Sequence, residues 1–297
     1  MKKSYLLFIA LFGLSLNVQS ESIISVNAVN YPVWVERDQA IMSLAPGDEL
    51  DNGDLIKTGS SGRAWLYMND GSVIKLGQNA EFKVKKAAFV ENEQGTVLDA
   101  AFNVLKGAFR FTTSFFQAER KVPHQVNMQI GAITAGVRGT DIWGRSTEKE
   151  DFVTLLEGAI NVVADGGALP TRMEQPNTLY RKKVDQDAEP VSTMDQMLVN
   201  ILALETELSK AEGIATVDGQ YDLVLMSLMD GSLSADNMDR FRQQGYAVRK
   251  QFVTLDEQRY TRIMMSGFVS IEAAMNQAKQ MEETFQLEGL WVKKFND

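Results

Sequence analysis

The sequence predicts an α+β protein of several domains, in which an all-β part comes first and a smaller mixed part follows a helical connector. From residue 22 to 163, apolar residues alternate with polar ones in short runs, and turn signals such as Asn69-Asp70-Gly71 separate the runs. From residue 192 onward, apolar residues recur at helical spacing, and capped helical segments alternate with strand-like ones. The first pattern is typical of a β-sandwich, a β-roll or a short β-solenoid, and alternation alone does not choose among them.

The first twenty residues have the pattern of a secretory signal peptide. Lys2 and Lys3 form a short basic region, residues 5–16 are mostly apolar, and Val18 and Ser20 occupy the −3 and −1 positions of a cleavage site. We therefore expect residues 1–20 to be removed and the mature chain to be periplasmic. No later run reaches the roughly 18 apolar residues that a membrane span needs, so we expect no stable span in the mature chain.

The composition narrows the possible chemistry. The chain has no cysteine and a single histidine, which excludes disulfides, thiol catalysis and zinc–thiolate sites. Without Lys2 and Lys3, 28 basic residues face 39 acidic ones, a net charge of about −11 that disfavours nucleic acid as a partner. No catalytic motif is present either. We expect a protein that is not an enzyme, with no catalytic residue, metal or cofactor.

Four acidic residues lie close together in the all-β part: Asp48, Glu49, Asp51 and Asp54. Carboxylates of this kind can bind calcium, but their spacing differs from that of an EF-hand loop. We interpret them as turn residues.

Four short motifs mark the all-β part. They are GD-x-x-x-x-GD-x-I-x-T at residues 47–58, DGS at 70–72, V-R-G-T at 137–140 and L-E-G at 156–158.

Together, and in this order, the four motifs resemble the FecR domain of bacterial envelope proteins, from about residue 33 to 163. The resemblance implies a non-catalytic, extracytoplasmic β domain, which we place at residues 21–164. We expect the signature residues Arg138, Gly139 and Thr140 to be structural, with Arg138 tying neighbouring loops together through its five donors.

Two connecting segments follow the FecR-like domain. Residues 165–191 contain paired glycines and three prolines, which predicts a terminal strand and a linker. Residues 192–213 predict a connecting helix that begins near Ser192 and Thr193 and ends at Gly213. Its methionine-rich apolar residues fall largely on one face, and we expect that face to pack into a core or against another helix.

Residues 214–297 have their own order of elements: strand, helix, strand, strand, helix, strand. This βαββαβ order predicts a ferredoxin-like unit. Within it, residues 262–274 read R-I-M-M-S-G-F-V-S-I-E-A-A. This motif resembles the core of the SPOR (sporulation-related repeat) domain. The resemblance implies a periplasmic module that binds peptidoglycan glycan strands stripped of their stem peptides.

Strand alternation predicts which side chains the SPOR-like sheet presents on its open face. The expected outward residues are Val224, Met226, Arg262 and Met264. The family's usual first strand carries a glutamine, a glycine and a phenylalanine that are all replaced here, so the expected face is mostly apolar. We interpret it as a glycan-binding or partner-binding surface, because Arg262 supplies donors and exposed apolar patches mark interaction sites.

These observations predict a periplasmic envelope binding protein that docks to peptidoglycan through its SPOR-like domain and presents its FecR-like domain to an envelope protein partner. One alternative is a sensor of the FecR signalling type. FecR proteins proper relay the state of an outer-membrane receptor to a cytoplasmic sigma factor, and we expect this chain to need a separate membrane partner for such a role. A second alternative is a structural assembly factor that oligomerises through the methionine-rich helix.

Overall fold

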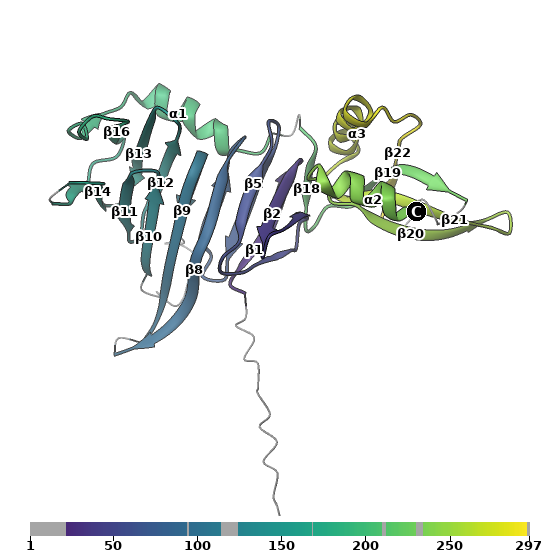
Figure 1. Ribbon diagram of the computed structural model, residues 1–297, viewed down its shortest axis with the longest axis horizontal. Coiled ribbons are helices and arrows are strands. Elements are labelled where there is room, and N and C mark those ends of the chain that lie inside the picture. The colour runs from purple at the N-terminus through teal and green to yellow at the C-terminus, as the bar shows by residue number, and fades with distance from the viewer. Residues whose placement is uncertain are drawn as a thin grey trace, which may run out of the picture.

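The computed structural model describes residues 22–93, 95–113, 124–167, 169–209, 212–229 and 234–295 (Figure 1). The expected signal peptide lies outside these residues. A β domain forms the larger body, and a mixed C-terminal unit lies beside it, to the right in Figure 1. No helix among the described residues is long and apolar enough to cross a membrane.

The β domain consists of two sheets that are joined by a shared strand. The first sheet has the strand order β18-β1-β6-β7-β9-β12-β13-β16-β17, and the second has the order β3-β2-β5-β8-β9-β10-β11-β14-β15. The strands are β1 (Ile24–Asn30), β2 (Val33–Arg37), β3 (Ala40–Ser43), β4 (Glu49–Leu50), β5 (Leu55–Thr58), β6 (Arg63–Met68), β7 (Val73–Leu76), β8 (Glu81–Asn92), β9 (Gly95–Thr112), β10 (His124–Ile130), β11 (Ile133–Val137), β12 (Asp141–Ser146), β13 (Glu150–Glu157), β14 (Ile160–Ala164), β15 (Thr171–Met173), β16 (Thr178–Lys183) and β17 (Ser192–Thr193).

Alternation along the strands places the core between the two sheets. In β6, Ala64, Leu66 and Met68 are buried, whereas Arg63 and Trp65 lie on the outer face. Four buried phenylalanines fill the centre: Phe82, Phe102, Phe109 and Phe111.

Strand β9 joins the two sheets. Its first half pairs with β8 and β10, and its second half pairs with β7 and β12. Gly107 lies at the crossing with φ = +84°, and a Cβ there would approach the Ala80 Cα to 2.6 Å. Only glycine fits this bend. Of the sandwich, roll and solenoid that the sequence left open for the β part, the structure shows a two-layered roll whose sheets share one strand.

The prediction of a linker at residues 165–191 is wrong for most of that segment. It contains β15 and β16, which pair with β14 and β13. Leu179 and Tyr180 of β16 are buried, so this strand is part of the domain. The apolar run of β16 is short and flanked by charged residues, so the strand is hard to recognise in the sequence.

The connecting helix is shorter than expected. Helix α1 spans Gln196–Ala203, begins at the N-cap Asp195, and continues as the 3-10 turn η1 (Leu204–Thr206). The expected packing of its methionine-rich face is also wrong. Val199 is buried, and Leu202 packs against the domain. Four apolar residues of the connector face solvent: Met197, Leu198, Ile201 and Leu204.

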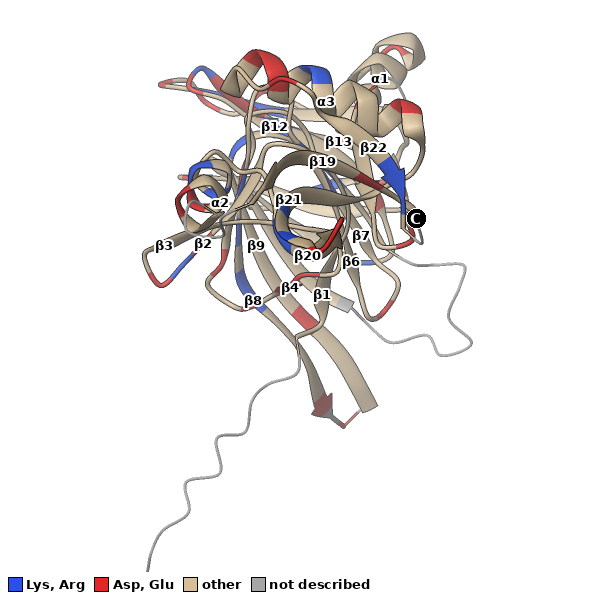
Figure 2. Ribbon diagram, turned by 90° about the vertical axis from the view of Figure 1, so that its right-hand side faces the viewer, with Lys and Arg blue, Asp and Glu red and all other residues tan. Residues whose placement is uncertain are grey.

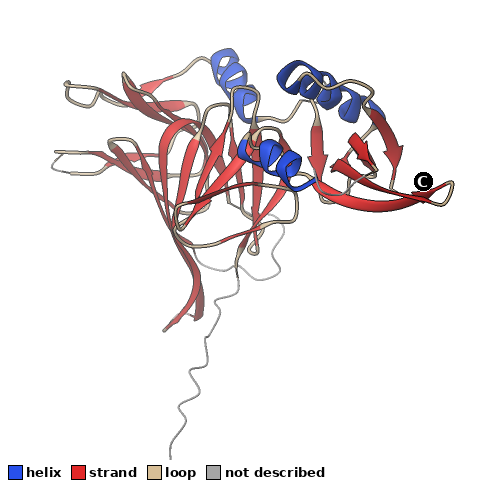
Figure 3. Cartoon of the chain, turned by 45° about the vertical axis from the view of Figure 1, so that its right-hand side comes forward, coloured by secondary structure: helices blue, strands red, loops and turns tan. Residues whose placement is uncertain are grey.

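The C-terminal unit has the predicted order of elements, and its sheet has the antiparallel strand order β22-β19-β21-β20. Both helices pack on one face of this sheet (Figure 3). Phe241 of α2 meets Phe285 of α3 there, with ring centroids 4.9 Å apart. Its elements are β18 (Ile214–Thr216), β19 (Tyr221–Leu228), α2 (Ser234–Gln243), β20 (Arg249–Leu255), β21 (Gln258–Phe268), α3 (Ile271–Phe285) and β22 (Trp291–Lys294).

The C-terminal unit is joined closely to the β domain. Strand β18 pairs with β1 on one side and, through Ala215 and Phe268, with β21 on the other. The Val33 N–H donates to the Gly245 carbonyl at 2.9 Å, and the Trp34 Nε1–H donates to the Gln243 carbonyl at 3.0 Å. The two parts therefore share both backbone pairing and a packed interface.

Candidate functional site

A β-bulge changes the face that the sequence predicted for the C-terminal sheet. Val224 lies opposite Met264 and Met226 lies opposite Ile263, so Leu225 is the extra residue of strand β19. Beyond a bulge the alternation is shifted by one residue, which turns Met226 toward the helices, where it packs on the core. The prediction that Met226 lies on the open face is wrong for this reason.

The remaining predicted residues share the open face but do not form an exposed apolar surface. Val224 and Met264 are fully buried, because they lie in one cross-strand row between Trp291 and Arg249. The Arg262 guanidinium is half-buried, with its carbon 5.6 Å from the centre of the Trp291 ring. The face is therefore lined by cations and aromatic rings rather than by methionine and valine.

A buried carboxylate anchors this face. Asp222 is fully buried, and its Oδ2 lies 3.0 Å from the Arg249 Nη2 and 3.7 Å from the Lys293 Nζ. Figure 2 shows basic and acidic segments side by side on the unit. Sequence reasoning did not identify this group. An aspartate inside the apolar run Y-D-L-V-L-M was the available sign, because a buried charge requires a partner.

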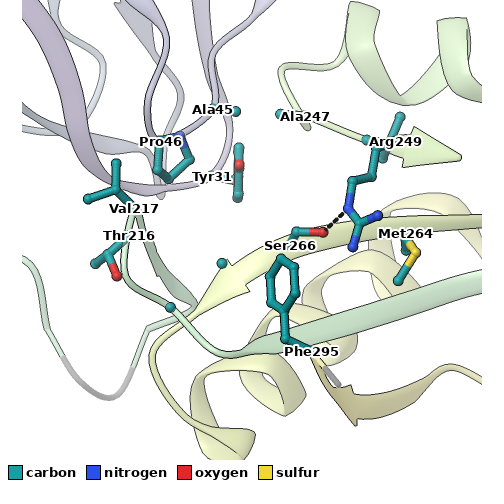
Figure 4. Close-up of a pocket in the computed structure, with 13 residues that line it drawn as sticks. Tyr31, Ala45, Pro46, Thr216, Val217, Ala247, Arg249, Met264, Ser266 and Phe295 are labelled. Carbon is teal, nitrogen blue, oxygen red and sulfur yellow. Dashed lines mark hydrogen bonds between the residues drawn. The ribbon is translucent and has the colours of Figure 1, made fainter. Parts of the chain in front are cut away.

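A cavity of about 320 Å³ lies between this face and the β domain (Figure 4). Tyr31 and Pro46 line it from the β domain, whereas Arg249, Ser266 and Phe295 line it from the C-terminal unit. Burial raises the pKa of the Tyr31 phenol, so Tyr31 contributes to the cavity as a neutral side chain. The volume suits a small ligand, and Arg249 is its charged group.

The FecR-like signature residues form a turn rather than a binding group. Arg138 is exposed and makes no hydrogen bond or ion pair with the residues that the structure describes, so its expected role in tying loops together stays a prediction. Thr140 holds the end of β12, because its N–H donates to the Thr113 Oγ1 at 2.6 Å and its carbonyl accepts from the Thr113 N–H at 3.0 Å. Gly139 adopts φ = +67°, and its carbonyl lies 2.5 Å from where a Cβ on Gly158 would stand. The two glycines are thus required by close packing of the turns.

The acidic motif also forms turns, as predicted. Asp54 is fully buried and accepts two hydrogen bonds from Arg37, at 2.8 and 2.6 Å, and one from the Asp51 N–H at 2.8 Å. Asp48 accepts from the Ala45 N–H at 2.7 Å. Within the described part of the chain, no group of three or more histidine, cysteine or acidic side chains is placed to hold a metal ion.

Comparison with known proteins identifies the β domain. A protein-family model described as "FecR protein" matches residues 54–161, from the end of the acidic turn to strand β14. The chain therefore carries a FecR domain, which confirms this resemblance, whereas the SPOR resemblance stays a prediction. No protein of curated function matches the chain.

Among solved structures, the chain is similar to two crystal structures, at 2.50 and 1.65 Å resolution, of a candidate anti-sigma factor from Parabacteroides distasonis. Both are 13% identical with a TM-score of 0.37, and the matches cover 78% and 81% of this chain and 91% and 98% of those chains. At these values the likeness carries no functional argument.

Proposed function

We propose that the chain is a non-catalytic regulatory protein of the FecR type, which acts in the periplasm by binding an envelope protein partner. The observation that carries this proposal is the FecR match over residues 54–161, which spans most of the β domain. The resemblance implies reversible recognition rather than chemistry. The signature residues fit that reading, since they are used for turns and are not part of the outer faces of the sheets.

The connection between the two parts supports a regulatory role. Strand β18 pairs with β1 of the β domain and with β21 of the C-terminal unit. The Tyr31 and Tyr246 rings meet across the interface with centroids 6.2 Å apart. A partner that shifts one part must therefore disturb contacts made by the other. Such coupling is what transmission of a binding event requires.

Docking to peptidoglycan glycan strands through residues 214–297 is the second candidate. The burial of Val224 and Met264 removes the surface on which it was based. One observation still favours it: Trp291 and Phe295 remain partly exposed beside Arg262 and Arg249, and aromatic rings next to donors suit sugars.

A gene deletion in the source organism distinguishes the two candidates. The regulatory proposal expects a discrete set of transcripts to change in the deletion strain and to be restored by the intact chain. It also expects the purified chain to stay in the supernatant when peptidoglycan sacculi are pelleted, before and after amidase treatment. Binding to amidase-treated sacculi with no change in transcripts would reject the regulatory proposal in favour of wall docking.

A further inference from the structure

The outer face of the first sheet carries a row of cations and tryptophans on four adjacent strands. Trp65 lies opposite Lys75, Lys75 opposite Arg110, and Arg110 opposite Trp143. Residues directly opposite one another share a face, so these four side chains stand side by side. Arg63 and Arg145 flank the row, each two residues along its strand from a tryptophan. We name these six residues the outer platform.

The connector lies on this platform and pairs with it by charge. We define the strap as residues 204–209 and 212, which follow α1 toward β18 (Figure 1). Glu207 contacts the Lys75 Nζ at 2.7 Å and the Arg110 Nη1 at 3.3 Å. The strap's other two carboxylates pair with the flanking arginines: Glu212 contacts the Arg63 Nη1 at 2.5 Å, and Glu205 pairs with Arg145.

The strap is held by side chains of the sheet and not by a β-ladder. The Arg63 Nε–H donates to the Glu205 carbonyl and the Trp65 Nε1–H donates to the Thr206 carbonyl, both at 3.1 Å. Among the described residues, no strand pairing joins the strap to the sheet. An attachment made of ion pairs and side-chain contacts to two carbonyls can be exchanged for another segment that offers the same groups.

Two polar groups of the platform region are left without partners under the connector. The Trp143 Nε1 and the Thr154 Oγ1 are buried, belong to residues opposite each other on β12 and β13, and make no hydrogen bond with any residue that the structure describes. Leu202 and Met194 pack against the cluster around Trp143, and neither side chain offers an oxygen there. A buried donor without an acceptor is costly. A segment that places an acceptor near Trp143 would complement this surface better than α1 does.

We propose that the outer platform binds an acidic segment of a partner protein, and that the strap occupies the platform when the partner is absent. The strap defines the chemistry, with carboxylates at positions i, i+2 and i+7, the first of which lies on the 3-10 turn η1. This inference rests on the proposed function and names the class of partner that the FecR domain recognises. Partner binding would displace the strap and thereby act on the C-terminal unit to which the strap leads.

The test uses a labelled peptide of residues 203–213, A-L-E-T-E-L-S-K-A-E-G, and fluorescence anisotropy with the purified full chain. The variant E205Q/E207Q/E212Q weakens the strap and should bind this peptide at least ~10-fold more tightly than the wild type, because the ion pairs of three carboxylates no longer compete. Adding K75Q to the variant should reverse most of that gain. A peptide with glutamine at the same three positions is the matched control and should not bind.

Two outcomes would overturn the inference. One is a variant that is folded by circular dichroism but binds the peptide no better than the wild type. The other comes from hydrogen exchange of the wild type, which needs no variant. When the salt concentration is raised from 0.05 to 1 M, the amides of the strap should exchange at least ~10-fold faster while those of β6 and β7 stay protected. An unchanged exchange rate in the strap would show that it does not leave the platform. A transcript response in the deletion strain would stand in either case, so failure of this inference is distinguishable from failure of the proposed function.

Discussion

The substitution Gly245→Ala tests whether the two parts of the molecule are locked together. Gly245 follows α2 with φ = +81°, and its carbonyl accepts the hydrogen bond from Val33. A Cβ at this position would lie 2.5 Å from the Trp34 Cε2 and 2.9 Å from the Pro32 Cβ. The methyl group must therefore push against the β domain.

Two costs add up at this position. A left-handed backbone costs an alanine about 1–2 kcal/mol. Overpacking against a ring that cannot move away costs about 1–3 kcal/mol more. Gly289 is the matched control, because it has φ = +73° and no atom lies within 4 Å of where its Cβ would stand. Gly289→Ala should cost only the first amount, so the difference between the variants isolates the contact with Trp34.

Urea unfolding followed by tryptophan fluorescence and by hydrogen exchange measures this difference. We expect Gly245→Ala to lower the free energy of unfolding by about 1–3 kcal/mol more than Gly289→Ala. The extra loss should appear first as faster exchange at the interface, in β2 and at the end of α2, while the centre of the β domain stays protected. Equal losses in the two variants would refute the reasoning, since they would show that the C-terminal unit is not pressed against Trp34.

Two further predictions concern buried polar groups. Arg37→Ala should destabilise the chain by about 3 kcal/mol, because it leaves the fully buried Asp54 without its counter-ion. In thermal unfolding, the double variant Arg37→Ala/Asp54→Ala should recover part of this loss. A loss below about 1 kcal/mol for Arg37→Ala would contradict the role of the pair. Burial raises the pKa of both Tyr31 and Tyr246, so folding favours their neutral phenols: this stability is fully present below the ordinary tyrosine pKa of about 10 and is lost as the pH rises above it. The free energy of unfolding should therefore begin to fall near pH 10 and fall further above it, and Y31F/Y246F should remove most of that fall; an equally steep fall in the variant would show that other groups cause it.

Local patterns predicted much of the fold. Alternation in runs such as residues 64–68 places every second side chain on one face, and the structure buries those that were apolar. The element order over residues 221–294 was readable because Ser270 caps the start of α3 and Gly245 follows the last turn of α2, each by its own chemistry. These features depend on neighbouring residues only.

Features that depend on distant pairing were not readable. The bulge at Leu225 follows from the register between β19 and β21, and it reversed the expected direction of Met226. The central row of the outer platform is made of residues 65, 75, 110 and 143. These residues become neighbours only when four strands have paired. The role of Arg138 was not readable either, because its motif is local whereas the contacts of an exposed side chain depend on the surrounding loops.

The connector shows why a pattern of apolar residues alone misjudges a segment. Its stripe at Met197, Leu198, Ile201 and Leu204 has the spacing of a core helix, and the structure leaves these four residues exposed. Val199 and Leu202 pack on the domain instead, and Glu205 and Glu207, which follow the helix, pair with cations of the sheet.

The distribution of charge along the chain changes what its total charge implies. The net charge of −9 disfavours an anionic partner, yet Arg63, Lys75, Arg110 and Arg145 are gathered on one face and pair there with three glutamates of the strap. Arg110 is also paired with Asp141 of its own sheet at 2.6 Å. If the strap lifts, the net charge does not change, but Arg63, Lys75 and Arg145 lose their glutamates while Arg110 keeps Asp141, so the preference of this face for acidic partners is set by the state of the strap. Such a preference weakens with ionic strength, because the exchanged contacts are ion pairs that remain partly open to solvent.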